Sequence, residues 1–234
     1  MAGKKNKTDR HKRFVKRLWQ VYIGVWGIVL LMIILSAFGV FGYMPDLDEL
    51  ENPKSSLATE IYSSDGQLLG TYFRENRSNI AYEDISENLI NALIATEDIR
   101  YEKHSGVDLK AVIRMVVGVL TFSDRGGGST VTQQLAKNLF PRERKSKLGL
   151  VTMKFKEWVV GVKLERRFTK KEILTYYFNT VPFGGNSYGI KIAAKSYFDK
   201  KPSELTVEES ALLIGMLKGP TRYHPVRNPN NALN

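Results

Sequence analysis

The sequence predicts a mainly α-helical domain that carries a small β-hairpin and follows one N-terminal transmembrane helix. An uncharged run, 18–43, comes after a basic N-terminus. The dipeptide Asp65-Gly66 separates two short strand patterns, and helical periodicity with capping signals occupies the chain from Ser86 onward. A length of 234 residues suits one domain with a substantial core, and we find no internal repeat.

Composition restricts the chemistry that the chain can perform. There is no cysteine, which excludes disulfides, thiolate metal sites and cysteine nucleophiles. Any catalytic group must therefore present oxygen or nitrogen. The formal net charge of +11 favours an anionic partner, and charge alone leaves nucleic acid, acidic lipid headgroups and a phosphorylated substrate as candidates.

The N-terminal segment predicts a membrane anchor. The uncharged run 18–43 is longer than the about 20 apolar residues that span a bilayer and the about 7–15 of a cleaved signal peptide. Because cations stay on the cytoplasmic side, we expect a cytoplasmic tail at 1–17, a single-pass anchor in the cytoplasmic (inner) membrane at 18–43, a juxtamembrane linker at 44–57 and an exported domain at 58–234. A hydrophobic core helix is the alternative for this run. The cations that precede it are Lys4, Lys5, Lys7, Arg10, Lys12, Arg13, Lys16 and Arg17.

The exported part begins with two strands and continues as helices. Thr59–Tyr62 and Gln67–Phe73 have strand character, and Asp65-Gly66 suits a tight turn between them. Ser86 is expected to cap a helix that ends near residue 98. Further helices are expected at 108–122, 129–139, 148–167 and after two capping boxes, Thr169 with Glu172 and Thr206 with Glu209.

The segment Val112–Phe122 is unusually apolar for a half-buried helix and too short to span a membrane. Two interpretations remain open. Part of the segment dips into the membrane interface and helps a lipid tail to enter the site, or the helix is fully buried in the core.

The longest helical pattern, 148–167, presents two faces of different character. Lys154, Glu157 and Gly161 share one face by their i, i+3, i+7 spacing. This face is either a solvated surface with an ion pair or a carboxylate and a cation presented to a cleft, with glycine leaving room for a ligand. The other face is an apolar stripe that we expect to face the core, formed by Leu148, Val151, Phe155, Val159 and Val162.

A glycine-rich stretch, Gly126–Gly128, precedes a helix start with five polar side chains among residues 129–134. Such a turn can offer backbone N–H groups to an anion, but it lacks the lysine of a P-loop, so a flexible connector is an equal alternative. The polar helix start predicts a lined site rather than a packed core. Taken by themselves, Glu97 and His104 can also be structural residues, a carboxylate at a helix end and a histidine in the core.

Four segments, taken together and in order, resemble glycosyltransferase family 51, the polymerase domain of bifunctional penicillin-binding proteins and of monofunctional transglycosylases. Glu97–Gly106 resembles the first motif, E-D-x-x-F/Y-x-x-H-x-G. Gly127–Gln134 is similar to the second, G-x-S-T-x-T-Q-Q. Lys154–Glu157 resembles the third, R-K-x-x-E. Lys171–Leu174 with Tyr177–Asn179 resembles the fourth, K-x-E-I-L-x-x-Y-L-N.

The sequence departs from the family pattern at two places. Met153 stands where the third motif has arginine, which removes a cation expected to face a diphosphate; Arg144, Lys145 and Lys147 lie nearby to compensate. The sequence ends at Asn234, before the expected fifth motif, R-x-x-x-V-L-x-x-M, and we expect it to be an N-terminal fragment of a longer protein. No Ser-x-x-Lys of a transpeptidase is found, so penicillin binding is not predicted for these residues.

The resemblance implies a lysozyme-like fold and the polymerisation of lipid II into β-1,4 glycan strands, with inversion and release of polyprenyl diphosphate. This displacement needs a base at the acceptor hydroxyl and positive charge at the diphosphate. Carried over from the family, Glu97 is the base, and Glu157 is the second catalytic carboxylate, which holds Lys154 or a divalent cation, Mg²⁺ or Mn²⁺, near the diphosphate. No other cofactor is implied. The substrate-binding or supporting residues implied by the motifs are Asp98, His104, Ser129, Thr130, Gln133, Gln134, Lys137, Lys154 and Asn179.

The implied partners are lipid II, the growing glycan strand, the membrane and other cell-wall synthesis proteins. A lysozyme-like hydrolase with a similarly placed glutamate is the nearest rival, but polymer cleavage releases no diphosphate and does not explain a basic third motif. A non-catalytic membrane scaffold is expected to lose its catalytic carboxylates, whereas Glu97 and Glu157 are present. Nucleic-acid binding has no supporting motif and does not fit an exported domain.

Overall fold

The structure is a computed structural model that describes residues 10–24, 27, 31, 59–65, 68–72, 80–121, 127–139, 147–184 and 187–232. The chain divides into two units, Met1–Met44 and Pro45–Asn234. In the first unit, residues 10–24 form a helix with exposed side chains. None of the helices in the described ranges is long and apolar enough to cross a membrane. Most of the predicted anchor, 18–43, and the predicted linker, 44–57, lie outside those ranges.

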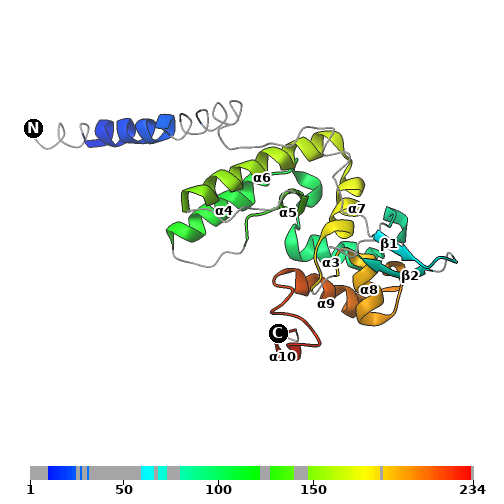
Figure 1. Cartoon of the computed structure of the whole chain (residues 1–234). Helices are drawn as coiled ribbons and strands as arrows, with labels where there is room; N and C mark the ends of the chain where they lie inside the picture. The colour runs from blue at the N-terminus through cyan, green and yellow to red at the C-terminus, as the bar shows by residue number, and fades with distance from the viewer. Residues whose placement is uncertain are drawn as a thin grey trace, which may run out of the picture. The chain divides into compact units, whose positions relative to one another are not determined.

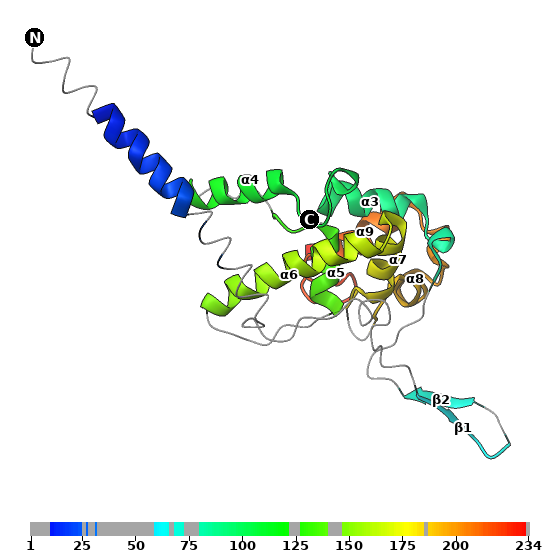
Figure 2. The same cartoon turned by 90° about the horizontal axis from the view of Figure 1, so that it is seen from above.

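The second unit is mainly helical, as the sequence predicts (Figures 1 and 2). Its two strands pair antiparallel, with Thr59 opposite Tyr72. They correspond to the predicted strands to within a residue or so at their ends. Within the described ranges, short 3₁₀ segments occur at Tyr82–Asp84, Tyr101–Lys103 and Pro202–Glu204. The strands and helices are β1 (Thr59–Tyr62), β2 (Leu68–Tyr72), α3 (Glu87–Glu97), α4 (Leu109–Leu120), α5 (Val131–Leu139), α6 (Lys147–Arg167), α7 (Lys170–Thr180), α8 (Ile190–Phe198), α9 (Val207–Leu217) and α10 (Pro229–Ala232).

Three helices begin at the capping residues that the sequence indicates. Ser86 accepts a hydrogen bond from the backbone N–H of Leu89 at 3.2 Å and begins α3. Thr169 with Glu172 begins α7, and Thr206 with Glu209 begins α9, each as a reciprocal capping box. A cap of this kind contributes about 1 kcal/mol to stability. These predicted helix starts are confirmed.

The core lies where α5 packs between α6 and α7 and where α3 packs on α9. Figures 1 and 2 both place α5 beside α6 and α7. Fully buried aromatic rings fill much of this core, and each such ring contributes a large apolar area. They belong to Tyr101, Tyr177, Phe178 and Phe183. The polar start of α5 and the end of α3 are therefore attached to a rigid, well-packed interior.

The buried face of α6 differs from the predicted one. The predicted core stripe is only half-buried where its side chains are described, at Phe155, Val159 and Val162. Val160 and Leu164 are buried instead, with 4% and 1% of their surfaces exposed. The predicted orientation of this helix is therefore wrong.

Close backbone packing explains why α6 turns this face inward. Gly106 has φ of +87°, and a Cβ atom built there would lie 2.7 Å from the carbonyl carbon and oxygen of Gly161 on α6. A Cβ atom at Gly161 would lie 3.6 Å from Cγ of Gln133 on α5. The helix thus packs through a glycine against the backbone at residue 106 and the polar start of α5. A hydrophobic pattern cannot indicate such a contact, because the contact needs small residues rather than large apolar ones.

We expect Gly106→Ala to lower the free energy of unfolding by at least about 2 kcal/mol, because a left-handed φ costs a non-glycine residue about 1–2 kcal/mol and overpacking costs more. Thermal or denaturant unfolding measures this loss. Gly215→Ala on α9 is the matched control, since a Cβ atom there would have no neighbour within 4 Å. A Gly106→Ala variant as stable as the parent protein would contradict the close approach of residues 106 and 161.

Candidate active site

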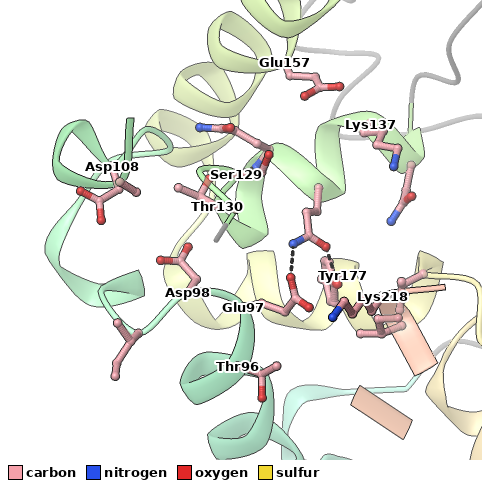
Figure 3. Close-up of a pocket in the computed structure, with 18 of the residues that line it drawn as sticks. Thr96, Glu97, Asp98, Asp108, Ser129, Thr130, Lys137, Glu157, Tyr177 and Lys218 are labelled. Atoms are coloured by element: carbon pink, nitrogen blue, oxygen red, sulfur yellow. Dashed lines mark hydrogen bonds between the residues drawn. The ribbon is translucent and has the colours of Figure 1, made fainter. Parts of the chain in front are cut away.

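A cleft of about 880 Å³ lies over the end of α3, the start of α5 and the middle of α6 (Figure 3). It brings together residues that are far apart in the sequence. In Figure 3, Ser129 and Thr130 lie between Glu157 and Glu97. Eight of the eleven predicted site residues line this cleft, namely Glu97, Asp98, Ser129, Thr130, Gln133, Gln134, Lys137 and Glu157.

At one end of the cleft, Glu97 is the last residue of α3 and is held by two side chains in series. The amide Nε2 of Gln134 donates a hydrogen bond to Oε2 of Glu97 at 2.6 Å. The hydroxyl of Tyr177 donates to Oε1 of the same Gln134 at 3.0 Å (dashed lines in Figure 3). Burial, and to a lesser degree the charge of Glu97, raises the pKa of Tyr177 far above its usual value, so the phenol keeps its proton.

Asp98, next to Glu97, joins the first two motifs. Its two carboxylate oxygens each lie 3.0 Å from Nε2 of His104, and one of them accepts the backbone N–H of Val131 at 3.0 Å. Val131 is the first residue of α5, and the positive end of the helix dipole there also stabilises the negative charge of Asp98. The side chain of His104 is only 4% exposed and does not line the cleft. The described geometry gives His104 a supporting position behind Asp98.

The start of α5 is tied to the turn at Gly106. Thr130 Oγ1 donates to the carbonyl oxygen of Gly106 at 2.7 Å, and Gln133 Nε2 donates to the same oxygen at 3.0 Å. The backbone N–H of Gln133 in turn donates to Thr130 Oγ1 at 3.2 Å. The backbone N–H groups of Val131 and Gln133 at this helix start are therefore both used in hydrogen bonds within the protein. This does not support an anion-binding site formed by these two N–H groups.

At the other end of the cleft, Glu157 and Lys154 provide the carboxylate and the cation that the sequence predicts. Lys154 Nζ lies 2.9 Å from Glu157 Oε2 and donates to Ser129 Oγ at 2.6 Å. Glu157 is only 7% exposed, which rules out the interpretation of a solvated surface pair. Lys137 on α5 is exposed and lines the same cleft.

Two predicted residues remain outside the lining of the cleft, besides His104. Lys154 reaches its edge through Ser129 and Glu157, which do line it. Asn179 does not reach it. The side-chain oxygen of Asn179 accepts the N–H of Ile80 at 3.0 Å and its amide donates to the carbonyl of Ile80 at 3.1 Å. The described contacts of Asn179 are thus structural, and its role in substrate binding stays a prediction.

A partly buried ion pair behind the cleft was not indicated by the predicted site. Lys170 Nζ lies 2.8 Å from Glu165 Oε1 and donates to the carbonyl of His104 at 2.8 Å. Thr132 Oγ1 donates to the same Glu165 oxygen at 2.6 Å. The sequence does indicate Lys170. In the fourth motif, K-x-E, the lysine lies two residues before the glutamate, and two residues before Glu172 is Lys170. The assignment of that lysine to position 171 is wrong by one residue.

Other charged residues of the cleft were also missed. Arg100 Nε lies 3.5 Å from Asp108 Oδ2, and Arg114 donates to the carbonyl of Gly127 at 3.4 Å. Lys218 follows the end of α9 and reaches the cleft near Tyr177 (Figure 3). Nothing in the sequence pattern links this distant lysine to the four motifs.

The protein side chains do not form a metal centre in the part of the chain that the structure describes. Within those ranges no three His, Asp or Glu side chains lie close enough together to hold a metal ion. Of the two cations that the resemblance implies for Glu157, Lys154 or a divalent ion, Lys154 is the one paired with it in the structure.

Comparison with known proteins identifies the family. Residues 65–234 match the family model described as Transglycosylase. The chain belongs to the transglycosylase family. The chain is 38% identical over 202 residues to Penicillin-binding protein 1A of Neisseria flavescens, a match that covers 86% of the chain and 25% of that protein. It is 37% identical over 219 residues to Penicillin-binding protein 1A of Aquifex aeolicus, covering 92% and 30%.

Among solved structures, the chain is similar to the crystal structure of Penicillin-Binding Protein 1A from Haemophilus influenzae. That match has 22% sequence identity and a TM-score of 0.39, and it covers 76% of this chain and 17% of that chain. The chain thus spans about a quarter to a third of the length of the curated relatives that it matches.

Proposed function

We propose that this member of the transglycosylase family is a peptidoglycan glycosyltransferase, which polymerises lipid II into β-1,4 glycan strands with inversion and release of polyprenyl diphosphate. One observation carries the proposal. The cleft holds an oriented carboxylate, Glu97, at one end and a buried carboxylate with its cation, Glu157 with Lys154, at the other. A displacement at a sugar carbon needs a base at the entering oxygen and positive charge at the departing diphosphate.

In this reaction Glu97 accepts the proton of the 4-hydroxyl of the incoming sugar. The oxygen attacks C1 of the donor sugar while the bond from C1 to the diphosphate oxygen breaks, and the diphosphate leaves with the bonding electrons. Attack from the face opposite the leaving group turns an α-linked donor into a β-linked product. Asp98 is a weaker candidate for the base, because its oxygens already accept hydrogen bonds from His104 and Val131.

The charge on the departing diphosphate is stabilised by Lys154 and Lys137. Glu157 keeps Lys154 in place, since a buried carboxylate is costly unless it is paired and hydrogen-bonded. Ser129 accepts a further hydrogen bond from the same ammonium group and so restricts its direction. The second carboxylate therefore acts on the leaving group through the lysine.

Formation of polymer tests the proposal. The complete protein, purified in detergent, is incubated with lipid-linked disaccharide, and the products are separated by size. We expect glycan chains of many disaccharides. A protein that leaves lipid-linked disaccharide unchanged but shortens preformed glycan would support a hydrolase, and one that does neither would support a scaffold.

We further propose that 18–43 anchors the protein as a single pass in the cytoplasmic membrane, with residues 1–17 in the cytoplasm and the catalytic domain on the outer face. The basic N-terminus supports this orientation. Because the native chain has no cysteine, Ser196→Cys, at an exposed position on α8, provides a single label. We expect an impermeant thiol reagent to label it in intact spheroplasts, whereas labelling only after lysis would contradict the orientation.

We also propose that α4 contacts the membrane interface, where the lipid tail of the substrate resides. An exposed apolar stripe supports this contact: Leu109, Ile113 and Val117 are 71%, 63% and 37% exposed and follow one another at four-residue spacing. On the same helix, Ala111 and Arg114 line the cleft. Within 112–122, the exposure of Ile113 and Val117 favours this contact over the fully buried helix that the sequence left open.

Replacing Ile113 by asparagine should weaken association with liposomes by roughly five- to ten-fold, as expected from the loss of one large apolar side chain at the interface. The unfolding temperature should not change, because the side chain is exposed in water. Val207→Asn is the control, since Val207 on α9 is also 63% exposed. Equal liposome binding by the Ile113→Asn and Val207→Asn variants would contradict a specific role for α4.

A further inference from the structure

The side chains that hold Glu97 form a continuous chain from the hydrophobic core to the cleft. Tyr177 on α7 is fully buried, its ring packs edge-on against Phe178 at 5.9 Å between centroids, and only its hydroxyl reaches the polar site. Gln134 bridges that hydroxyl and Oε2 of Glu97 with both ends of its amide. A flexible glutamine side chain is thus fixed at both ends, one of them by a ring that packing holds in place.

The chemistry of these groups sets the direction of each hydrogen bond. An ionised carboxylate only accepts, so Gln134 must turn its NH₂ group toward Glu97. The amide oxygen then faces Tyr177 and needs a donor, which the phenol provides because burial keeps it protonated. In the described part of the chain, Gln134 is the residue that donates to this carboxylate, and it uses Oε2. Its other oxygen, Oε1, accepts no hydrogen bond within the described ranges, and Glu97 lines the cleft.

We propose that Tyr177 is a positioning residue for the catalytic base, acting through Gln134 to hold the Glu97 carboxylate with Oε1 toward the acceptor hydroxyl. This role rests on the proposed function, since it presupposes that Glu97 takes a proton from that hydroxyl. A base must lie within hydrogen-bond reach of its proton, and small displacements of a catalytic group lower the rate more than they lower binding. The packing of Tyr177 in the core thereby sets the position of the Glu97 carboxylate at the end of α3.

Tyr177→Phe tests this role, because it removes the hydroxyl and keeps the packed ring. We expect the single-turnover rate of polymerisation to fall roughly ten-fold, as for loss of one buried hydrogen bond that leaves its acceptor unpaired. Substrate affinity should stay within about two-fold of the parent value, because the lost contact does not touch the substrate. Tyr197→Phe is the matched control. It removes another tyrosine hydroxyl, which donates to the carbonyl of Phe183 at 2.9 Å, and it should keep the parent rate.

The same substitution in a Gln134→Met background shows whether the effect passes through Gln134. We expect Gln134→Met alone to lower the rate at least as much as Tyr177→Phe, and Tyr177→Phe to add no more than about two-fold to it. The positioning role of Tyr177 would be overturned by either of two results. One is that Tyr177→Phe lowers the rate as much in the Gln134→Met background as it does alone; the other is that Tyr177→Phe alone keeps the parent rate. If Tyr177→Phe unfolds, Gln134→Met decides alone: a parent rate overturns the relay, and a lowered rate with unchanged affinity supports it. Failure of the unsubstituted protein to form polymer would instead count against the proposed function.

Discussion

Glu97→Gln is expected to lower the single-turnover rate of polymerisation by about 10²–10⁴-fold, the contribution of a positioned general base. The substitution keeps the shape of the side chain and removes its basicity. It also preserves the contact with Gln134, because the new amide oxygen can accept the hydrogen bond that Oε2 accepts now. Substrate affinity should change little, since the proton is transferred only in the transition state.

Single-turnover kinetics and substrate binding, measured on the complete protein, separate the two effects. Asp98→Asn is the informative comparison, because that carboxylate is engaged by His104 and the start of α5 and should affect stability as well as rate. Retention of more than about a tenth of the rate by Glu97→Gln would contradict its role as the base. The proton would then require another acceptor.

Lys154→Ala is expected to weaken substrate binding roughly ten-fold or more, because a charge-assisted contact to phosphate contributes about 1.5–3 kcal/mol. Binding of lipid-linked disaccharide to the complete protein measures this loss. Unlike Glu97→Gln, the variant should lose affinity and rate together, since the diphosphate is already charged in the ground state. Lys195→Ala on α8 is the control, because that lysine is 71% exposed and pairs with Asp199 outside the cleft.

Loss of Lys154 also removes a partner of the buried Glu157, so part of the effect could arise from a less stable fold. The double variant Lys154→Ala with Glu157→Gln addresses this, because it removes the buried charge together with the cation. We expect it to recover stability and not affinity. Binding as tight as that of the parent protein by Lys154→Ala would contradict the assignment of the diphosphate end of the cleft.

The parts of the fold that the sequence predicted correctly depend on local signals. The caps at Ser86, Thr169 and Thr206 act within three residues of chain, and the structure places helix starts at each of them. Such features need no knowledge of what packs against them.

The inward face of α6 could not be read from its hydrophobic pattern. Its orientation depends on Gly161 meeting Gly106, a contact between residues far apart in sequence. The same contact places Glu157 at the cleft and buries it. A carboxylate and a glycine in the middle of a helix resemble a solvated face until the partner surface is known.

Family motifs selected most of the candidate site but not the partners of its residues. The motifs indicated Glu97, Gln134 and Tyr177 separately, whereas their hydrogen-bonded series depends on how α3, α5 and α7 pack. Asn179 was assigned to substrate because it belongs to a motif, yet its amide is used by the backbone of Ile80. A motif residue can thus serve the fold rather than the reaction.

The central claim is that the protein joins lipid-linked disaccharides and releases polyprenyl diphosphate. The most direct test counts the glycosidic bonds formed and the polyprenyl diphosphate released in one reaction. A glycosyltransferase with Glu97 as base and Lys154 at the diphosphate should release one diphosphate for each new β-1,4 bond. Release of diphosphate with free reducing disaccharide would mean that water is the acceptor. Cleavage of glycan without any diphosphate would contradict the account altogether and indicate a hydrolase.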